Sequence, residues 1–274
     1  MDKNLRELQL CELDILKEVV KICNRHNLTY YMMGGTFLGA IRHKGFIPWD
    51  DDVDISLNRE EYDKLLEILP KELPNNYKID NFLTNKDSLI YATRVENSLI
   101  KVKDNSASIK KIRNAWIDIF PLDGMPNNTI IRKLHEFRLL YLRLKFKYST
   151  FSETVTQNKK DRSIHEKILV TIGNYTKIEK ILDKNKCLKD LDKALRKYEY
   201  KNSNYVVNFM GAYKFKEMFK KAIYEKYKLY DFENTKLNAP ENYNFVLTQM
   251  YGNYMQIPQK DMQNKHCIEV IKEW

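Results

Sequence analysis

Two aspartates at alternate positions are the residues of this chain best placed to do chemistry. Asp52 and Asp54 stand on either side of Val53 in an alternating polar and apolar segment. Because successive strand residues face opposite ways, the two carboxylates are predicted to share one face while Val53 turns toward a core. Carboxylates held so close repel each other unless a cation lies between them. All-oxygen ligands favour Mg²⁺ or Mn²⁺ over zinc, and Asp50 is a further candidate ligand.

A glycine pair upstream predicts an anion-binding turn. The apolar run 30–33 ends at Gly34 and Gly35, and Thr36 begins the next element. Glycine permits close backbone approach, so the amides of residues 35–37 are expected to form a hollow for a phosphate, with the Thr36 hydroxyl as an added donor. A plain tight turn is the alternative. The acidic strand that follows favours a combined metal and phosphate site.

A third carboxylate and two arginines complete the candidate set. Asp118 lies in the middle of the apolar strand predicted at 115–120. A buried aspartate there needs a metal or a cationic partner, whereas one on an edge strand would face water. Asp123 is interpreted as a turn residue. Arg42 and Arg94 are candidate phosphate ligands, and Arg42 could instead pair with Asp50 or the adjacent Asp51.

The residues 35–55 resemble the LicD family almost residue for residue. More broadly, the 34–36 turn with the 52–55 strand resembles the nucleotidyltransferase superfamily, which has a palm of the DNA polymerase beta type. The LicD family contains phosphorylcholine transferases of bacterial surface polysaccharides and is related to fukutin-type ribitol-phosphate transferases. Segments 232–233, 240 and 251–258, with His266, follow the family's carboxy-terminal pattern, although Gln259 replaces a usual proline.

The resemblance implies a reaction and the residues for it. A hydroxyl of a teichoic acid or lipopolysaccharide precursor would attack the phosphorus that carries choline in CDP-choline, and CMP would leave. Asp52, Asp54 and Asp118 would be catalytic and hold two metal ions, with residues 34–36, Arg42 and Arg94 around the donor. Phe37, Trp49 and Trp116 adjoin the motifs and are candidates for a choline-binding box, against ordinary core packing.

Three other functions stay open at this point. The same site could transfer another CDP-linked head group, such as ribitol or glycerol phosphate. It could be a nucleotidyltransferase that releases diphosphate from a nucleoside triphosphate. The chain could also be a non-catalytic protein that binds glycans or a membrane surface, but the complete aspartate set opposes that interpretation.

Composition limits the partners and the location of the protein. A chain of 274 residues, 43% of them apolar, can bury a substantial core. A net charge of +10 favours anionic partners, and without a recognised nucleic-acid module we expect an anionic, lipid-linked glycan rather than nucleic acid. With no long apolar segment or export signal, the protein is predicted to be cytoplasmic, peripheral at the inner face of the membrane, with reduced cysteines.

The patterning predicts an α/β (α+β) fold, with a mixed sheet flanked by helices and a largely helical C-terminal portion. The division is placed between a catalytic core at 1–125 and an acceptor or lid portion at 126–274. Residues 151–162 are polar and are interpreted as a lid, or equally as a surface loop. Helices are expected at 3–26, 129–148, 163–184, 186–200 and 212–228, and strands at 77–80, 89–95, 99–103 and 115–120.

Overall fold

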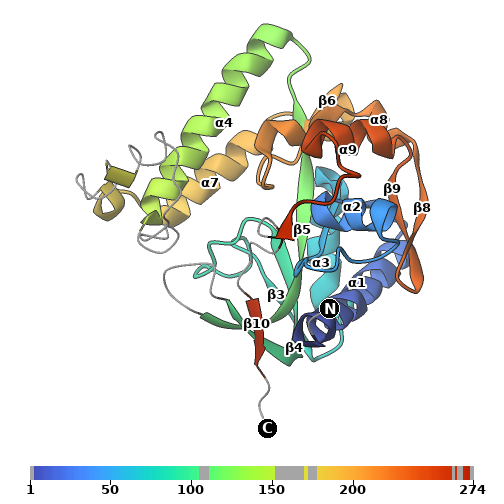
Figure 1. Cartoon of the computed structure of the whole chain (residues 1–274). Coiled ribbons are helices and arrows are strands. Elements are labelled where there is room, and N and C mark those ends of the chain that lie inside the picture. The colour runs from blue at the N-terminus through green and yellow to red at the C-terminus, as the bar shows by residue number, and fades with distance from the viewer. Residues whose placement is uncertain are drawn as a thin grey trace.

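A mixed β-sheet runs through the centre of the protein (Figure 1). The structure is a computed structural model that describes residues 3–104, 111–151, 170–171, 178–260, 263 and 268–271. Over these ranges the strand order is β1-β2-β5-β4-β10, with β3 also on β4, and with β6 and then β7 continuing from β5. The strands are β1 Tyr30–Met32, β2 Asp54–Asn58, β3 Tyr77–Asp80, β4 Thr93–Asp104, β5 Lys111–Met125, β6 Tyr205–Val207, β7 Met218–Lys220 and β10 Ile268–Ile271.

Helices and one hairpin cover this sheet. Helices α1 and α3 pack against each other and against β5, while α2 contacts β2 and the separate β8–β9 hairpin. The helix bounds are α1 Lys3–Arg25, α2 Gly34–Arg42, α3 Arg59–Glu72, α4 Thr129–Ser149, α7 Lys184–Leu195, α8 Ala222–Glu225 and α9 Tyr243–Tyr251, and the hairpin strands are β8 Tyr227–Phe232 and β9 Thr235–Pro240. The prediction of a mixed α/β fold with flanking helices is confirmed.

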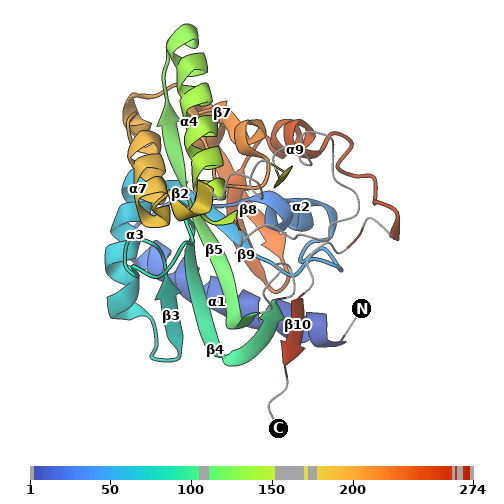
Figure 2. The ribbon, with the colours of Figure 1, turned by 90° about the vertical axis from the view of Figure 1, so that its left-hand side faces the viewer.

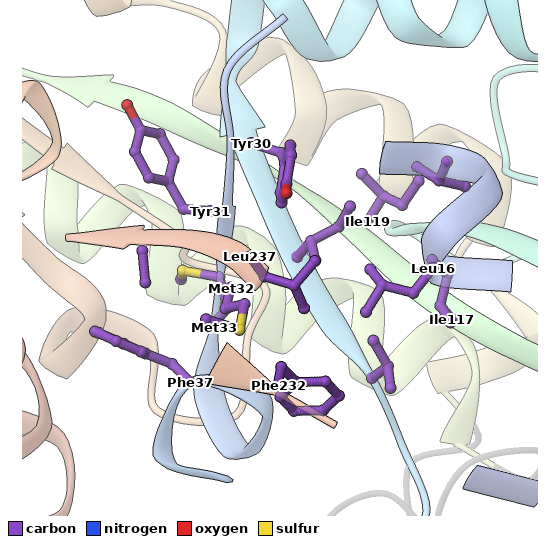
Figure 3. Packing of buried hydrophobic residues seen from close by; sticks show 14 of the residues in the cluster. Leu16, Tyr30, Tyr31, Met32, Met33, Phe37, Ile117, Ile119, Phe232 and Leu237 are labelled. Atoms are coloured by element: carbon purple, nitrogen blue, oxygen red, sulfur yellow. The ribbon is translucent and has the colours of Figure 1, made fainter. Parts of the chain in front are cut away.

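The main core lies between the sheet, α1, α2 and the β8–β9 hairpin (Figure 3). Ile117 and Ile119 of β5 meet Leu16 of α1, and Phe232 and Leu237 close the core from the hairpin side. Val53, Ile55 and Leu57 are almost fully buried, as the alternation predicts. The core therefore fixes which way Asp54, between Val53 and Ile55, turns.

A second, smaller core lies where α4 and α7 meet the far end of β5. Leu139 of α4 packs with Leu188, Leu191 and Leu195 of α7, together with Phe82 and Tyr91. The α4–α7 pair extends away from the sheet in both views (Figures 1 and 2). The domain boundary placed at 125/126 stays a prediction.

The main error of the sequence analysis lies at 212–228, where a helix was expected. That segment holds a short 3-10 turn at Lys214–Glu217, then β7, α8 and the start of β8. Its aromatic residues imitate helical spacing, but pairing of β7 with β6 and of β8 with β9 takes precedence. The strands expected at 89–95 and 99–103 are merged into the single strand β4, which begins only at Thr93 and has a register shift between Asn97 and Lys101.

Other predictions are confirmed or lie outside the described residues. The helices at 3–26 and 129–148 form as α1 and α4, and the one at 186–200 forms as α7 but ends at Leu195. Most of 163–184, nearly all of the 151–162 segment and His266 are outside the described residues. Cys11, Cys23 and Cys187 are buried and in no disulfide within the described part of the chain. No helix among the described residues has the length and apolar content needed to cross a membrane.

Candidate active site

Strands β2 and β5 bring Asp54 and Asp118 side by side. The two strands pair in parallel, with Asp54 opposite Asp118, and the Asp118 N–H donates to the Val53 carbonyl at 2.9 Å. Directly paired residues of neighbouring strands project from the same face of a sheet. Two carboxylates that are 64 positions apart in the chain are therefore juxtaposed by the fold, the arrangement that the family resemblance implied.

The glycine turn becomes the first turn of α2, next to the start of β2. Gly34 has a φ of +51°, which glycine adopts without strain. The Thr36 hydroxyl accepts a hydrogen bond from the Asp54 N–H at 2.9 Å, and the Met33 N–H donates to the Asp54 carbonyl at 3.0 Å. The Phe37 amide donates to Met33, so it belongs to the helix rather than to an open hollow. The turn thus fixes the backbone of Asp54.

Both glycines leave room for carboxylates. A Cβ on Gly34 would lie 3.3 Å from Oδ2 of Asp54, and one on Gly35 would collide with the Asp50 carboxylate. Acidic groups are favoured at a helix N-terminus because its N–H groups carry partial positive charge. The absence of side chains at 34 and 35 therefore lets Asp50 and Asp54 lie against the start of α2.

Negative charge is concentrated around Asp54. Burial, followed by the charges of Asp52 and Asp118 and then those of Glu217 and Asp50, raises the pKa of Asp54 well above its usual value. All of these influences oppose ionisation. The ionisation of Asp54 is therefore opposed by three other predicted aspartates and by a glutamate from the C-terminal portion.

This donor set suits a hard divalent cation by its chemistry. Several carboxylates around a partly buried aspartate are the oxygen ligands that Mg²⁺ and Mn²⁺ take, and a cation would relieve their mutual repulsion. Within the described ranges, however, no three or more His, Cys, Asp or Glu side chains are arranged closely enough to form a metal-binding group. The metal ligands stay a prediction, supported by the electrostatics of Asp54.

Asp118 has a cationic and an aromatic partner. Nε of Arg94 donates to its Oδ1 at 3.0 Å, and Nε1 of Trp116 donates to its Oδ2 at 3.3 Å. The Arg94 guanidinium also stacks on the Trp116 ring, 4.4 Å from the centroid. Arg94 therefore contacts a carboxylate of the candidate site. The Trp116 side chain contacts both Arg94 and Asp118 and helps to orient them.

Arg42 contacts the 254–256 segment and Trp49, and Phe37 lies in the core. Nη1 of Arg42 donates to the Tyr254 carbonyl at 2.8 Å, and its guanidinium lies 5.8 Å from the Trp49 ring centroid. Phe37 is buried in the core against Tyr230. Arg42 thus ties the end of α2 to the 254–256 segment, which explains part of the carboxy-terminal motif. Its predicted role at a phosphate stays untested.

Glu217 and Tyr251 adjoin the carboxylates and were not predicted as site residues. Glu217 is 3% exposed, accepts from the Tyr213 N–H at 2.9 Å and from Nδ2 of Asn208 at 2.8 Å, and burial raises its pKa to about 7. The Tyr251 hydroxyl lies close to Gly34, since a Cβ placed on that glycine would be 3.9 Å from it. Its ring meets that of Tyr213 edge-on at 5.2 Å. Only the motif at 251–258 could have pointed to Tyr251, whereas Glu217 lies in the segment misassigned as a helix.

Helix α1 supports the acidic loop from behind. Nε2 of Gln9 donates to the Asp50 carbonyl at 2.9 Å. Glu12 is 2% exposed, and its Oε2 has no hydrogen-bond partner among the described residues. Burial and then the charges of Asp52 and Asp51 raise the pKa of Glu12. The sequence identified α1 only as an amphipathic helix, because a polar residue on its buried face gives no sign of what it faces.

The β8–β9 turn braces the loop that leads into the site. The Glu233 N–H donates to the Lys44 carbonyl at 2.7 Å, and its carboxylate accepts from the Phe46 N–H at 3.2 Å. Arg6 of α1 pairs with the same carboxylate at 2.5 Å. The segment 232–233, matched in sequence to a family motif, therefore acts as a support for the 44–46 turn.

Paired aspartates on parallel strands, next to a glycine turn that opens a helix, define a nucleotidyltransferase-type domain. The family model described as "LicD/FKTN/FKRP, nucleotidyltransferase domain" matches residues 27–167, a range that includes the turn, Asp52, Asp54 and Asp118. The chain belongs to this family, and the resemblance found in its sequence is confirmed.

Named relatives agree with this assignment. The chain is 30% identical over 276 residues to the lipopolysaccharide cholinephosphotransferase LicD of Haemophilus influenzae, covering 97% of this chain and 96% of that protein. It is 24% identical over 127 residues to the human ribitol 5-phosphate transferase FKRP, covering 45% of this chain and 23% of that protein. An uncharacterized protein of Rickettsia typhi, RT0683, is 37% identical over 116 residues, covering 42% of this chain and 35% of that protein. The prediction that the chain is a transferase is confirmed.

Proposed function

We propose that the protein transfers phosphocholine from CDP-choline to a hydroxyl of an anionic, lipid-linked surface glycan and releases CMP. The alignment of Asp54 with Asp118 beside the start of α2 carries this proposal. The similarity to a lipopolysaccharide cholinephosphotransferase along almost the whole chain supports the choice of head group.

The reaction balances without a covalent enzyme intermediate. The acceptor oxygen bonds to the phosphorus that carries choline, and the bond from this phosphorus to the oxygen of CMP breaks with its electron pair on CMP. Asp118 takes the proton of the acceptor hydroxyl, since its carboxylate is held in place by Arg94 and Trp116. Arg94 and the first amides of α2 supply positive potential for the donor phosphates.

Asp52, Asp54 and Asp118, with Asp50 beside them, would hold Mg²⁺ or Mn²⁺. When bound, the ions would neutralise charge on the diphosphate and lower the pKa of the acceptor hydroxyl. The fit rests on the carboxylates that surround Asp54. Without a cation these groups oppose one another's ionisation, so the site is built for a positively charged partner.

The choline group is assigned to the ring faces of Tyr213 and Tyr251. A quaternary ammonium is held by aromatic faces, and these two rings form an edge-on pair close to the carboxylates. Both rings belong to the portion after residue 125, which we propose contributes the acceptor and head-group side of the site. The similarity to FKRP makes CDP-ribitol the second donor to test.

A donor panel tests the proposal. The protein with Mg²⁺ and a lipopolysaccharide or teichoic acid precursor is incubated separately with CDP-choline, CDP-ribitol, CDP-glycerol and CTP. We expect CMP release and labelled glycan with CDP-choline. Preference for CDP-ribitol would reassign the head group, and diphosphate released from CTP would replace the proposal with nucleotidyl transfer. A control variant, Leu99→Ser, changes a side chain that is 75% exposed on β4. We expect it to turn over CDP-choline as fast as the unaltered protein.

A further inference from the structure

Helix α4 exposes an apolar stripe along its length. Seven large apolar side chains of this helix are between 38% and 73% exposed. They are Ile130, Ile131, Leu134, Phe137, Leu140, Tyr141 and Leu144. Most of them recur every three or four residues, so they line one side of the helix. Contiguous exposed apolar surface of this kind marks an interaction site.

The opposite side of α4 is already packed. Leu139 is fully buried in the second core, and Arg132 and His135 are also buried. Arg132 donates to the Pro126 carbonyl at 3.0 Å and stacks on Tyr205, 4.1 Å from the ring centroid. These contacts fix the rotation of the helix, so its apolar stripe is held facing outward.

Basic residues flank the stripe on both sides. With 3.6 residues per turn, Lys133 and Lys147 fall along one edge, and Arg138 and Lys145 fall along the other. The helix carries six lysines and arginines and a single glutamate. Lys133 contacts that glutamate, Glu136, yet its side chain remains 62% exposed. An apolar stripe with basic residues along both edges is typical of a helix that lies in the surface of an anionic bilayer.

The position of α4 makes the stripe accessible. Both views show α4 rising beyond the rest of the molecule beside α7, with the end that follows β5 outermost (Figures 1 and 2). The most exposed apolar residues, Ile130, Leu134 and Phe137, belong to that outer half. A flat surface could therefore reach them without meeting the body of the protein.

We propose that the α4 stripe docks the protein onto a bilayer surface rich in anionic lipid. Apolar side chains enter the boundary between head groups and acyl chains, while the flanking cations meet lipid phosphates. A second copy of this chain is a poorer occupant, because stripe-to-stripe packing would bring basic margins together in a protein whose net charge is already +10. The inference rests on α4 alone and does not depend on the proposed reaction.

Vesicle binding tests this directly. The full chain is sedimented with vesicles of phosphatidylcholine, and with vesicles of phosphatidylcholine and phosphatidylglycerol in equal parts. We expect binding to the anionic mixture that weakens as salt is raised. Leu134→Ser with Phe137→Ser should weaken it at least about tenfold, and Lys133→Gln with Arg138→Gln should also weaken it about tenfold.

Matched variants elsewhere control for general loss of hydrophobicity or charge. Leu83→Ser with Leu99→Ser removes exposed apolar groups far from α4 in sequence, and Lys64→Gln with Lys71→Gln removes exposed charges from α3. Neither pair should change vesicle binding. Equal binding to both vesicle types, or the same loss in α4 and control variants, would overturn the proposal. Conversion of a dimer to a monomer by the α4 serines, without vesicle binding, would assign the stripe to a second copy instead.

Discussion

At the scale of single residues, the chemical role proposed for Asp54 opposes its contribution to folding. The charges of neighbouring carboxylates oppose the ionisation of Asp54. Asp54→Asn therefore removes repulsion between carboxylates and at the same time removes the central candidate metal ligand. We expect turnover to fall at least about a hundredfold while the melting temperature stays equal or rises. Turnover and thermal unfolding of this variant are compared with those of Asp14→Asn, which changes an exposed aspartate on α1. Near-normal turnover in Asp54→Asn would refute the site assignment.

Glu217 gives the protein a pH-dependent stability of known sign. Burial raises its pKa from 4.5 to about 7, so its contribution is fully present below about pH 4.5 and is lost as pH rises through about 7. The loss is on the order of 3 kcal/mol. Glu217→Gln should remove this fall in the free energy of unfolding, measured by urea titration from pH 4.5 to 8. Glu225→Gln, at an exposed site on α8, should keep the wild-type slope, and an unchanged slope in Glu217→Gln would show that another group is responsible.

At the scale of elements, the Thr36 hydroxyl is one of the groups that join the start of α2 to β2. Thr36 is 4% exposed and accepts from the Asp54 N–H, so Thr36→Val keeps the shape but leaves a part-buried N–H unpaired. The expected cost is about 1–3 kcal/mol of unfolding free energy, with reduced turnover because Asp54 loses its backbone anchor. Thr84→Val, which removes a hydroxyl from an exposed loop, should cost less. Equal costs in the two variants would mean that the bond to Asp54 is not important.

The local sequence pattern was sufficient to predict the strands that carry the candidate site. It was insufficient to predict the elements that enclose the site. The alternation around Asp54 and the apolar neighbours of Asp118 fix their strands, because burying one face of a strand sets its register. The 212–228 segment was misassigned because its aromatic residues imitate helical spacing, whereas its strands form by pairing with β6 and β9, which lie just outside it. Asp123, interpreted as a turn residue, lies inside β5 and is 2% exposed. Its partner Arg59 is 64 positions away in the chain, so no local sequence pattern predicts this ion pair.

At the scale of the whole molecule, a buried charge network joins the central sheet to the α4–α7 pair. Arg59 of α3 donates from Nε to Asp123 Oδ1 at 2.7 Å and from Nη2 to Asp123 Oδ2 at 2.8 Å. It also donates to the Tyr91 hydroxyl, which donates to Asp192 of α7 at 3.0 Å. The proposed docking helix is therefore anchored through α7 to the strand that carries Asp118.

This network predicts a large effect far from the active site. Asp123→Asn leaves the buried Arg59 without its bidentate carboxylate and should cost about 3–5 kcal/mol of unfolding free energy. Asp231→Asn breaks an ion pair whose side chains are more than half exposed and should cost far less, because solvent screens exposed charges. Arg59→Met with Asp123→Leu should recover much of the loss, because no uncompensated charge stays buried. Urea unfolding of all three variants checks the prediction, and similar costs for the two single changes would show that the network does not hold the two cores together.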